Sequence, residues 1–197
     1  MGELFYQLGR CFAFRRIEHA QLPWITWRLP LTLTAAVATI FIVLPAKPDL
    51  FGDGGLNGSI ISLVATLPGF FIAALAAVST FQRETLDEIM PSPAPRLKLR
   101  TRGQEEAADL TMRMFLSHLF AYLTTYSFLL ALLCVVCEAL SPSVQMIVQT
   151  WGNDIPLLGL FVRLAYVAMV AWFLSNIITA TLFGMYFLAE RMHRPNA

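Results

Sequence analysis

Four long apolar segments dominate the chain and restrict what it can fold into. They cover residues 29–44, 59–81, 114–137 and 157–189. A bilayer has a hydrocarbon core about 30 Å thick, which a helix of about 20 apolar residues crosses. Only 14% of the residues are charged, whereas an average soluble domain has about 25%. The sequence therefore predicts an all-α polytopic membrane protein with four transmembrane helices.

The positive charges predict how these helices are oriented. Twelve of the 14 Lys and Arg residues lie in the N-terminal arm, the loop between the second and third segments, and the C-terminal tail, which are all on one side of the membrane. Only Lys47 and Arg163 lie in or beside the two loops on the opposite side. Cytoplasmic segments carry an excess of Lys and Arg, so both termini are expected to be cytoplasmic. The predicted organisation is a cytoplasmic arm (1–28), a transmembrane domain (29–189) with a cytoplasmic loop (82–113), and a cytoplasmic tail (190–197).

The N-terminal arm has an amphipathic pattern. Leu4, Leu8 and Phe12 alternate with Arg10 and with the pair Arg15 and Arg16. A helix with one apolar and one basic face lies in the plane of the membrane surface. The arm is therefore predicted to contain an interfacial helix.

The second apolar segment has a face of small residues, which is the main candidate site. Small residues at every fourth position let two helix backbones approach closely inside a bilayer. This face is also mildly polar, so a narrow water-filled path is an equally open interpretation. The sequence predicts a pore-lining or helix-packing face made of Ser62, Ala65, Thr66, Gly69, Ala73, Ala77 and Thr80.

Pro68 and Gly69 predict a bend in the middle of the same segment. Proline has no backbone N–H, so the carbonyl of Val64 loses its helical partner and the helix bends. Irregular backbone at this depth is tolerated when it is buried in protein or faces a wet cavity. The bend thus suits a helix at the centre of an assembly, and it suits a hinge as well.

The loop 82–113 is the longest polar stretch, and its basic residues alternate. A proline-rich run from 91 to 95 precedes them, and the acidic residues at 105, 106 and 109 are expected to start the third helix. The spacing suits a strand-like arm better than a helix. One interpretation is an orientation signal lying on anionic lipid. The other is a site for an acidic partner or a phosphate-bearing ligand, formed by Arg96, Lys98, Arg100, Arg102, Arg15 and Arg16.

Other polar residues in the apolar segments leave alternatives open. Arg163 is either an interfacial arginine or a residue at an outer pore mouth. His118 is either a buried histidine bonded to a neighbouring hydroxyl or a pore-lining group. Cys134 and Cys137 have the spacing of a membrane thiol oxidoreductase pair, but such a relay needs a second pair, and packing explains them. We expect no catalytic residue, no metal site and no cofactor.

The order of these features resembles a known group of proteins. An aromatic and basic arm, the segment LPGFFIAALAAV from Leu67, a proline-rich basic loop and the segment LTMRMFLSHLFAYL from Leu110 follow one another. This layout resembles the small four-span membrane subunits of bacterial anti-phage defence systems, most closely the channel effectors of the Hailong type.

The resemblance implies a homotetrameric ion channel in the bacterial inner membrane, which disrupts the membrane potential when it opens. It implies gating by a cytoplasmic partner such as a nucleotidyltransferase, through a short oligonucleotide. A non-conducting sensor or scaffold that recruits a soluble effector, as in Kiwa systems, is the alternative.

Overall fold

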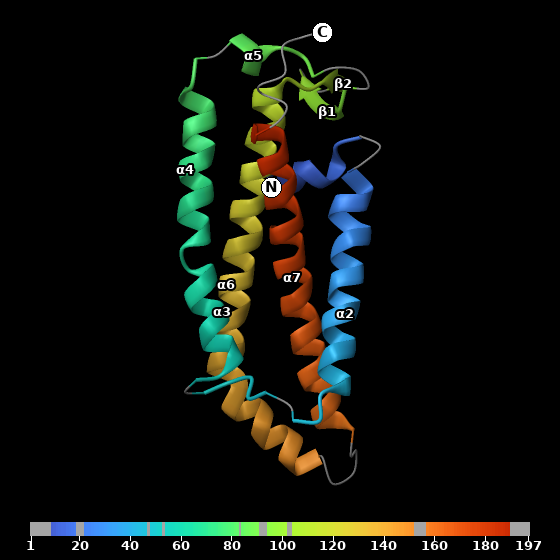
Figure 1. Ribbon diagram of the computed structural model, residues 1–197, viewed down its shortest axis with the longest axis vertical. Helices are drawn as coiled ribbons and strands as arrows, with labels where there is room; N and C mark the ends of the chain where they lie inside the picture. Colours follow the sequence, from blue (N-terminus) through green and yellow to red (C-terminus); the bar gives the residue numbers. More distant parts are fainter. Residues whose placement is uncertain are drawn as a thin grey trace.

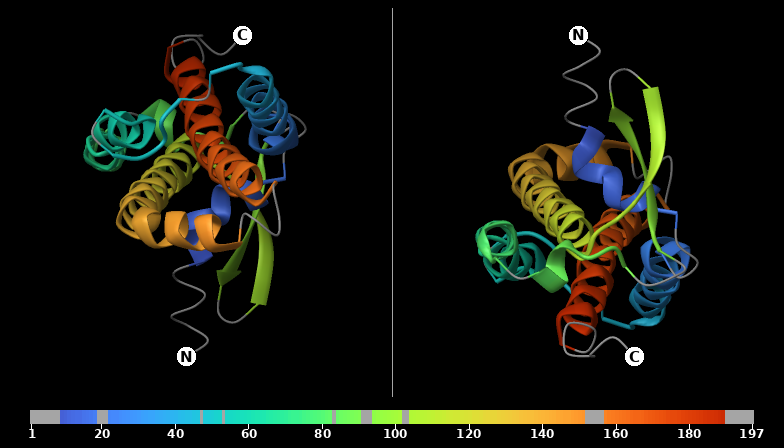
Figure 2. Two further views of the ribbon diagram at one scale, coloured as in Figure 1. Left: turned by 90° about the horizontal axis from the view of Figure 1, so that it is seen from below. Right: turned by 90° about the horizontal axis from the view of Figure 1, so that it is seen from above.

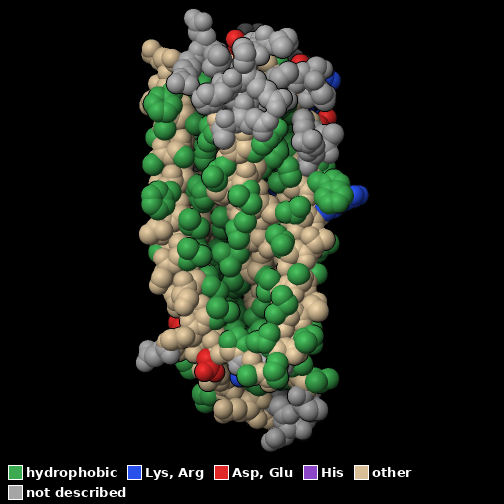
Figure 3. All heavy atoms as spheres, in the orientation of Figure 1, with side chains coloured by type: hydrophobic (Ala, Val, Ile, Leu, Met, Phe, Trp, Pro, Cys, Tyr) green, Lys and Arg blue, Asp and Glu red, His purple; other side chains and the backbone are tan. Residues whose placement is uncertain are grey.

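Four long helices run side by side in the computed structural model of this chain (Figure 1). The structure describes residues 9–18, 22–46, 48–52, 54–82, 84–90, 94–101, 104–151 and 157–189. Among these residues, four helical segments are long and apolar enough to cross a membrane. Apolar side chains cover the middle of the bundle (Figure 3). The prediction of an all-α polytopic membrane protein is confirmed.

The four spans lie where the apolar segments predict, with different ends. A short π-helix, η2 (Trp24–Arg28), continues directly into α2 (Leu29–Val43), so the first span starts earlier than predicted. The second span consists of α3 (Leu56–Val64) and α4 (Leu67–Thr80). The third is α6 (Met112–Trp151) and the fourth is α7 (Leu158–Ala189).

The helices form a row rather than a closed ring. Helix α7 packs against α2 on one side and α6 on the other, and α6 packs against α3 and α4. Viewed along the bundle, α2 and α4 lie at opposite sides (Figure 2). Helices α6 and α7 therefore form the centre, and each of the two edge spans has one side without a partner from the described part of the chain.

The second span is broken between its two helices. The break is a turn at Ala65 and Thr66, just before Pro68. A backbone hydrogen bond lies on each side of it, from the N–H of Ala65 to the carbonyl of Ile61 and from the N–H of Phe70 to the carbonyl of Thr66. Because Pro68 has no N–H, the regular ladder cannot continue through this point.

Helix α6 extends well beyond the predicted end of the third span. The predicted third span ends at residue 137, whereas the helix continues through Pro142 to Trp151. At 1.5 Å per residue its 40 residues reach about 60 Å. The last turns point aside from the rest of the helix (Figure 1), as proline inside a helix removes one hydrogen bond and bends it.

A small polar layer covers one end of the bundle. It contains α5 (Glu84–Asp87) and an antiparallel hairpin of β1 (Arg96–Thr101) and β2 (Gln104–Asp109). The alternating basic segment is a strand, as its spacing suggests. The expectation that the acidic residues 105–109 start the third helix was wrong. They form β2 instead, because they pair with the basic strand across the hairpin, and opposite charges on facing strands stabilise such a pair.

The described part of the N-terminal arm packs into this same end. It forms a short 3₁₀-helix, η1 (Arg10–Arg16), which contacts α6. The ring of Phe14 is fully buried and lies 5.7 Å from the ring of Phe115 and 5.3 Å from that of Tyr122. The described part of the arm thus contributes to the core between the helices, while its residues 1–8 and 19–21 lie outside the described residues.

Candidate functional site

The small-residue face of the second span points away from the rest of the chain. Helices α3 and α4 bury Ile60, Val64, Phe71 and Val78 against α6, while the bulky Leu63 and Phe70 are exposed. The small residues lie on the opposite side of the helix, because they are out of phase with this buried stripe. Ala77 is half-buried, and the other six residues of the face are exposed: Ser62, Ala65, Thr66, Gly69, Ala73 and Thr80.

One chain alone does not make a channel with this face. A Cβ added at Gly69 would have no neighbouring atom within 4 Å, so the space in front of the face is open. The hydroxyls on it donate to carbonyls of their own helix, Ser62 to Gly58 at 3.0 Å and Thr80 to Ala76 at 2.9 Å. Both residues are exposed, and a hydroxyl oxygen that donates its hydrogen can still accept a hydrogen bond from water or a polar partner.

The break in the second span opens onto the same side. Ala65 and Thr66 form the turn, and both are exposed. The carbonyl of Val64 has no N–H four residues later, because that position is Pro68. Such irregular backbone is found at membrane depth where protein or water covers it, not where lipid does.

Arg113 fastens the end of α4 to the polar layer. Its Nε donates to Asp87 Oδ1 at 2.6 Å, and its Nη2 to Asp87 Oδ2 at 2.9 Å. Its Nη1 donates to the carbonyl of Val78 at 2.8 Å, in the last turn of α4. The guanidinium thus binds a carboxylate of the loop and the negative end of a helix at once. The hydrogen bonds from Arg113 hold the pKa of Asp87 below its ordinary value.

Sequence reasoning missed this role, because Arg113 was only one of several basic residues that orient the spans. Its partners lie 26 and 35 residues away along the chain. One feature of the sequence could have indicated this role. Arg113 is the second residue of an apolar helix, and the loop that precedes this helix contains an acidic residue, Asp87, that could pair with it.

The predicted basic surface on the hairpin is partly neutralised. Arg96 forms an ion pair with Asp109, with 2.8 Å between Nε and Oδ1. Arg100 is in register with Glu105, and Lys98 is opposite Ala107 and exposed. The side chain of Arg100 and all of Arg102 lie outside what the structure describes. Of the described cations in the row, Lys98 alone has no acidic residue opposite it.

Arg15 and Arg16 are not part of that row. The Nη1 of Arg15 donates to the hydroxyl of Tyr126 at 2.7 Å, and its guanidinium lies 4.0 Å from the centre of the Trp27 ring. Arg15 therefore links η1 to α6 and η2, whereas Arg16 is exposed. Arg10 connects the two regions, because its Nη1 donates to the carbonyl of Lys98 at 3.4 Å.

A buried polar cluster fixes the other end of the second span. Asn57, in the first turn of α3, is fully buried. Its Nδ2 donates to Glu138 Oε2 at 2.6 Å and to the carbonyl of Cys134 at 3.0 Å, and its Oδ1 accepts from the hydroxyl of Tyr166. Glu138 also accepts from the N–H of Gly52 at 3.1 Å. The cluster ties the loop before α3 to both central helices.

The remaining candidates form no chemical site in the described part of the chain. Cys134 and Cys137 are free thiols on α6, and Cys134 is buried. His118 is half-buried on α6. The described residues contain no group of His, Cys, Asp and Glu arranged to hold a metal ion.

No family model, curated protein or solved structure matches this chain. The geometry of the second span and of the polar layer therefore carries the functional argument.

Proposed function

We propose that this protein is an oligomeric ion channel whose second span surrounds the central axis. The observation that carries the proposal is the break at Ala65 and Thr66, which opens onto an exposed face of small, mildly polar residues. Lipid is a poor cover for such backbone, and a second copy or a water-filled path is a good one.

The row of helices suits this arrangement. Helices α6 and α7 separate the two edge spans, so copies that meet through α3 and α4 leave α2 on the outside. A face of small residues lets neighbouring backbones approach, and its hydroxyl oxygens offer acceptors to water or ions along the axis. The resemblance to four-span defence subunits favours a homotetramer.

The polar layer is the proposed regulatory end. It holds the hairpin, η1 and α5 together, and Arg113 connects it to the last turn of α4. A partner or anionic ligand that displaces α5 would therefore pull on the span that surrounds the axis. The exposed Lys98 and Arg16 are its first contacts, and the positive-inside rule places this end in the cytoplasm.

The biological setting we propose is anti-phage defence at the bacterial inner membrane. It is supported by the resemblance in layout, which implies a nucleotidyltransferase partner and a short oligonucleotide signal. Cells that express the chain with its neighbouring gene should resist phage and lose membrane potential on infection. Resistance without depolarisation would favour the alternative, a non-conducting scaffold that recruits a soluble effector.

Ion flux in liposomes tests conduction. The purified protein, reconstituted with an ion-sensitive dye inside the vesicles, should conduct, and displacing α5 by the substitution Asp87→Arg should increase the flux. Lys98→Arg, which keeps its charge, is the matched control. Absence of flux from wild type and from Asp87→Arg alike, in protein that is folded and oligomeric, would contradict the channel.

A further inference from the structure

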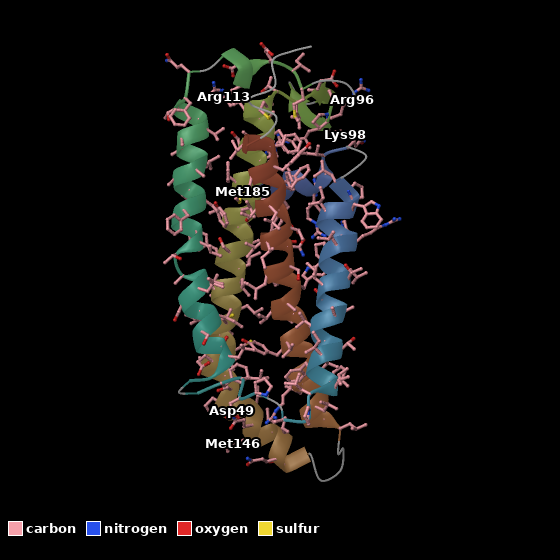
Figure 4. All side chains as sticks on the ribbon, in the orientation of Figure 1. Asp49, Arg96, Lys98, Arg113, Met146 and Met185 are labelled. Atoms are coloured by element: carbon pink, nitrogen blue, oxygen red, sulfur yellow. The ribbon has the colours of Figure 1, made fainter. Side chains whose placement is uncertain are left out.

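A cavity of about 560 Å³ lies at the end of the bundle opposite the hairpin. It is bounded by the loop before α3, the bent end of α6 and the first turns of α7. Its wall is mostly apolar, with Leu140, Val144, Val148 and Leu160 among the lining residues, and two charged residues, Asp49 and Arg163, line it as well. Asp49 marks this end of the bundle in Figure 4. Its size is within the range of about 300–1,000 Å³ typical of small-molecule sites.

The bend at Pro142 creates this space, and rigid contacts hold its walls. Beyond Pro142, α6 diverges from the bundle and returns toward α7 at Gly159. A Cβ at Gly159 would lie 3.2 Å from Cγ1 of Val148, so the glycine permits this close approach. On the inner side, the rings of Phe51 and Tyr166 lie 4.8 Å apart. Tyr166 is fixed in turn by its hydrogen bond to Asn57.

The two charged side chains of the cavity have no partner within the described part of the chain. Asp49 and Arg163 are both exposed at the mouth. Neither side chain forms an ion pair or hydrogen bond with another described residue, and they are not within ion-pairing distance of each other. The cavity thus offers one cation and one anion, set apart, beside an apolar wall.

Arg163 lies at the depth of the lipid headgroups. The candidate span in α7 has 31 residues, or about 46 Å at 1.5 Å per residue, which matches the about 40–45 Å of a bilayer with its headgroup layers. Arg163 is about 7.5 Å along the axis from the start of this helix. The cavity therefore opens at the depth where phosphates and ester groups lie, and its apolar wall lies beside that opening.

We propose that this cavity binds a zwitterionic phospholipid whose headgroup carries a primary ammonium. The phosphate contacts Arg163, the ammonium contacts Asp49, and an acyl chain lies along the apolar wall. A headgroup with net negative charge leaves Asp49 facing a like charge, which is unfavourable. A quaternary ammonium has no N–H to donate to the carboxylate, so phosphatidylethanolamine fits better than phosphatidylglycerol or phosphatidylcholine.

Native mass spectrometry of the protein in detergent tests the proposal. Phosphatidylethanolamine, phosphatidylcholine and phosphatidylglycerol with identical acyl chains are added in turn, and the retained adducts are titrated. We expect phosphatidylethanolamine to bind about fivefold more tightly than the other two, the upper end for a partly exposed charge pair. Arg163→Gln should weaken all three, and Asp49→Asn should remove the preference and raise binding of phosphatidylglycerol.

Two further variants separate the cavity from general headgroup contacts. Val144→Trp fills the cavity without changing a charge and should lose the adduct as Arg163→Gln does, while the melting temperature of both variants shows whether they are folded. Arg28→Gln removes an exposed cation on another span and should change nothing. Equal binding of the three lipids, a preference for phosphatidylglycerol in the wild type, or an unchanged preference in Asp49→Asn would overturn the proposal.

Discussion

The two edge spans of the row present different surfaces to the outside. The outward side of α2 has large side chains, among them Leu31 at 60% exposure and Ile40 at 59%. The outward side of α3 and α4 combines the stripe of small residues with large ones, among them Leu63 at 60% exposure and Phe70 at 68%. Both spans are long and apolar enough to cross a membrane, so their overall hydropathy does not say which of them contacts lipid. Large flexible side chains suit contact with lipid, and small ones suit contact with another helix.

The backbones of the two spans differ as well, because one is continuous and the other is broken. Helix α2 is continuous with η2, and its Pro30 lies at the junction of the two helices, where no turn interrupts the span. The second span has its proline in the middle and a turn before it. A polar anchor also fixes this span at each end, through Asn57 and Arg113. The comparison favours our proposal that protein or water covers α3 and α4, while the continuous α2 suits contact with lipid.

The largest effect is expected from a bulky residue on the small face. Ala73→Trp should disrupt the oligomer and lower ion flux by more than about tenfold, because overpacking costs about 1–3 kcal/mol at each close contact. Size-exclusion chromatography with light scattering and liposome flux measure the two effects. Ile40→Trp on α2 is the control and should leave both unchanged. If Ala73→Trp still forms an intact, conducting oligomer, the small face of the second span is not the contact between copies.

A large loss of stability is expected at the start of the second span. Asn57→Ala leaves the buried hydroxyl of Tyr166 without its acceptor, at a cost of about 1–3 kcal/mol, and removes one of the two donors to Glu138. Thermal unfolding should show a clearly lower midpoint. Ser59→Ala, an exposed neighbour on α3, should leave the midpoint in place. Equal midpoints for the two variants would show that this anchor contributes little.

A smaller loss is expected at the other end of the same span. Arg113→Gln removes the hydrogen bonds to Asp87 and to the carbonyl of Val78, and we expect a modest loss of stability because the Asp87 side chain is 61% exposed. Arg113→Lys should recover part of it, since an ammonium keeps the charge but lacks the planar fork. Hydrogen exchange at the end of α4 measures the loosening. Unchanged exchange there in Arg113→Gln would contradict the anchor.

The smallest effect is a dependence on pH. The pKa of Asp87 is held below its ordinary value of 3.8 in the folded protein. Its contribution to stability is therefore present above that value and is lost as the pH falls through the lower pKa. The difference in melting temperature between wild type and Asp87→Asn should be constant from pH 5 to pH 7 and should close below about pH 3.8. A difference that persists at lower pH would show that Arg113 does not act through the carboxylate.

Local sequence patterns predicted the four spans, because a long run of apolar residues is visible without knowledge of long-range contacts. The proline at position 68 pointed to the break, since its missing N–H is also a local property. The path of α6 through Pro142 was missed, because a helix bends around a proline where surrounding contacts support it. The strand at 104–109 was missed because its partner lies across a hairpin, and acidic residues suit a helix start equally well.

Three features of the site depend on contacts between residues far apart in the sequence, so the sequence alone did not predict them. The small face of the second span was visible as a pattern, but its outward direction depends on which side packs against α6. The joint role of Arg113, Asp87 and Val78 depends on contacts between residues 26 and 35 positions apart. The cavity beside Arg163 depends on the bend of α6. None of these is encoded in a spacing of three or four residues.

Cysteine cross-linking in membranes tests the central claim most directly. Cys11, Cys134 and Cys137 are replaced by alanine, and Ala73→Cys or the control Ile40→Cys is introduced in that background. After mild oxidation, we predict that Ala73→Cys forms disulfide-linked dimers and Ile40→Cys does not, because copies of the second span meet across the axis. Cross-linking through Ile40→Cys with none through Ala73→Cys would place α2 at the interface and contradict the account.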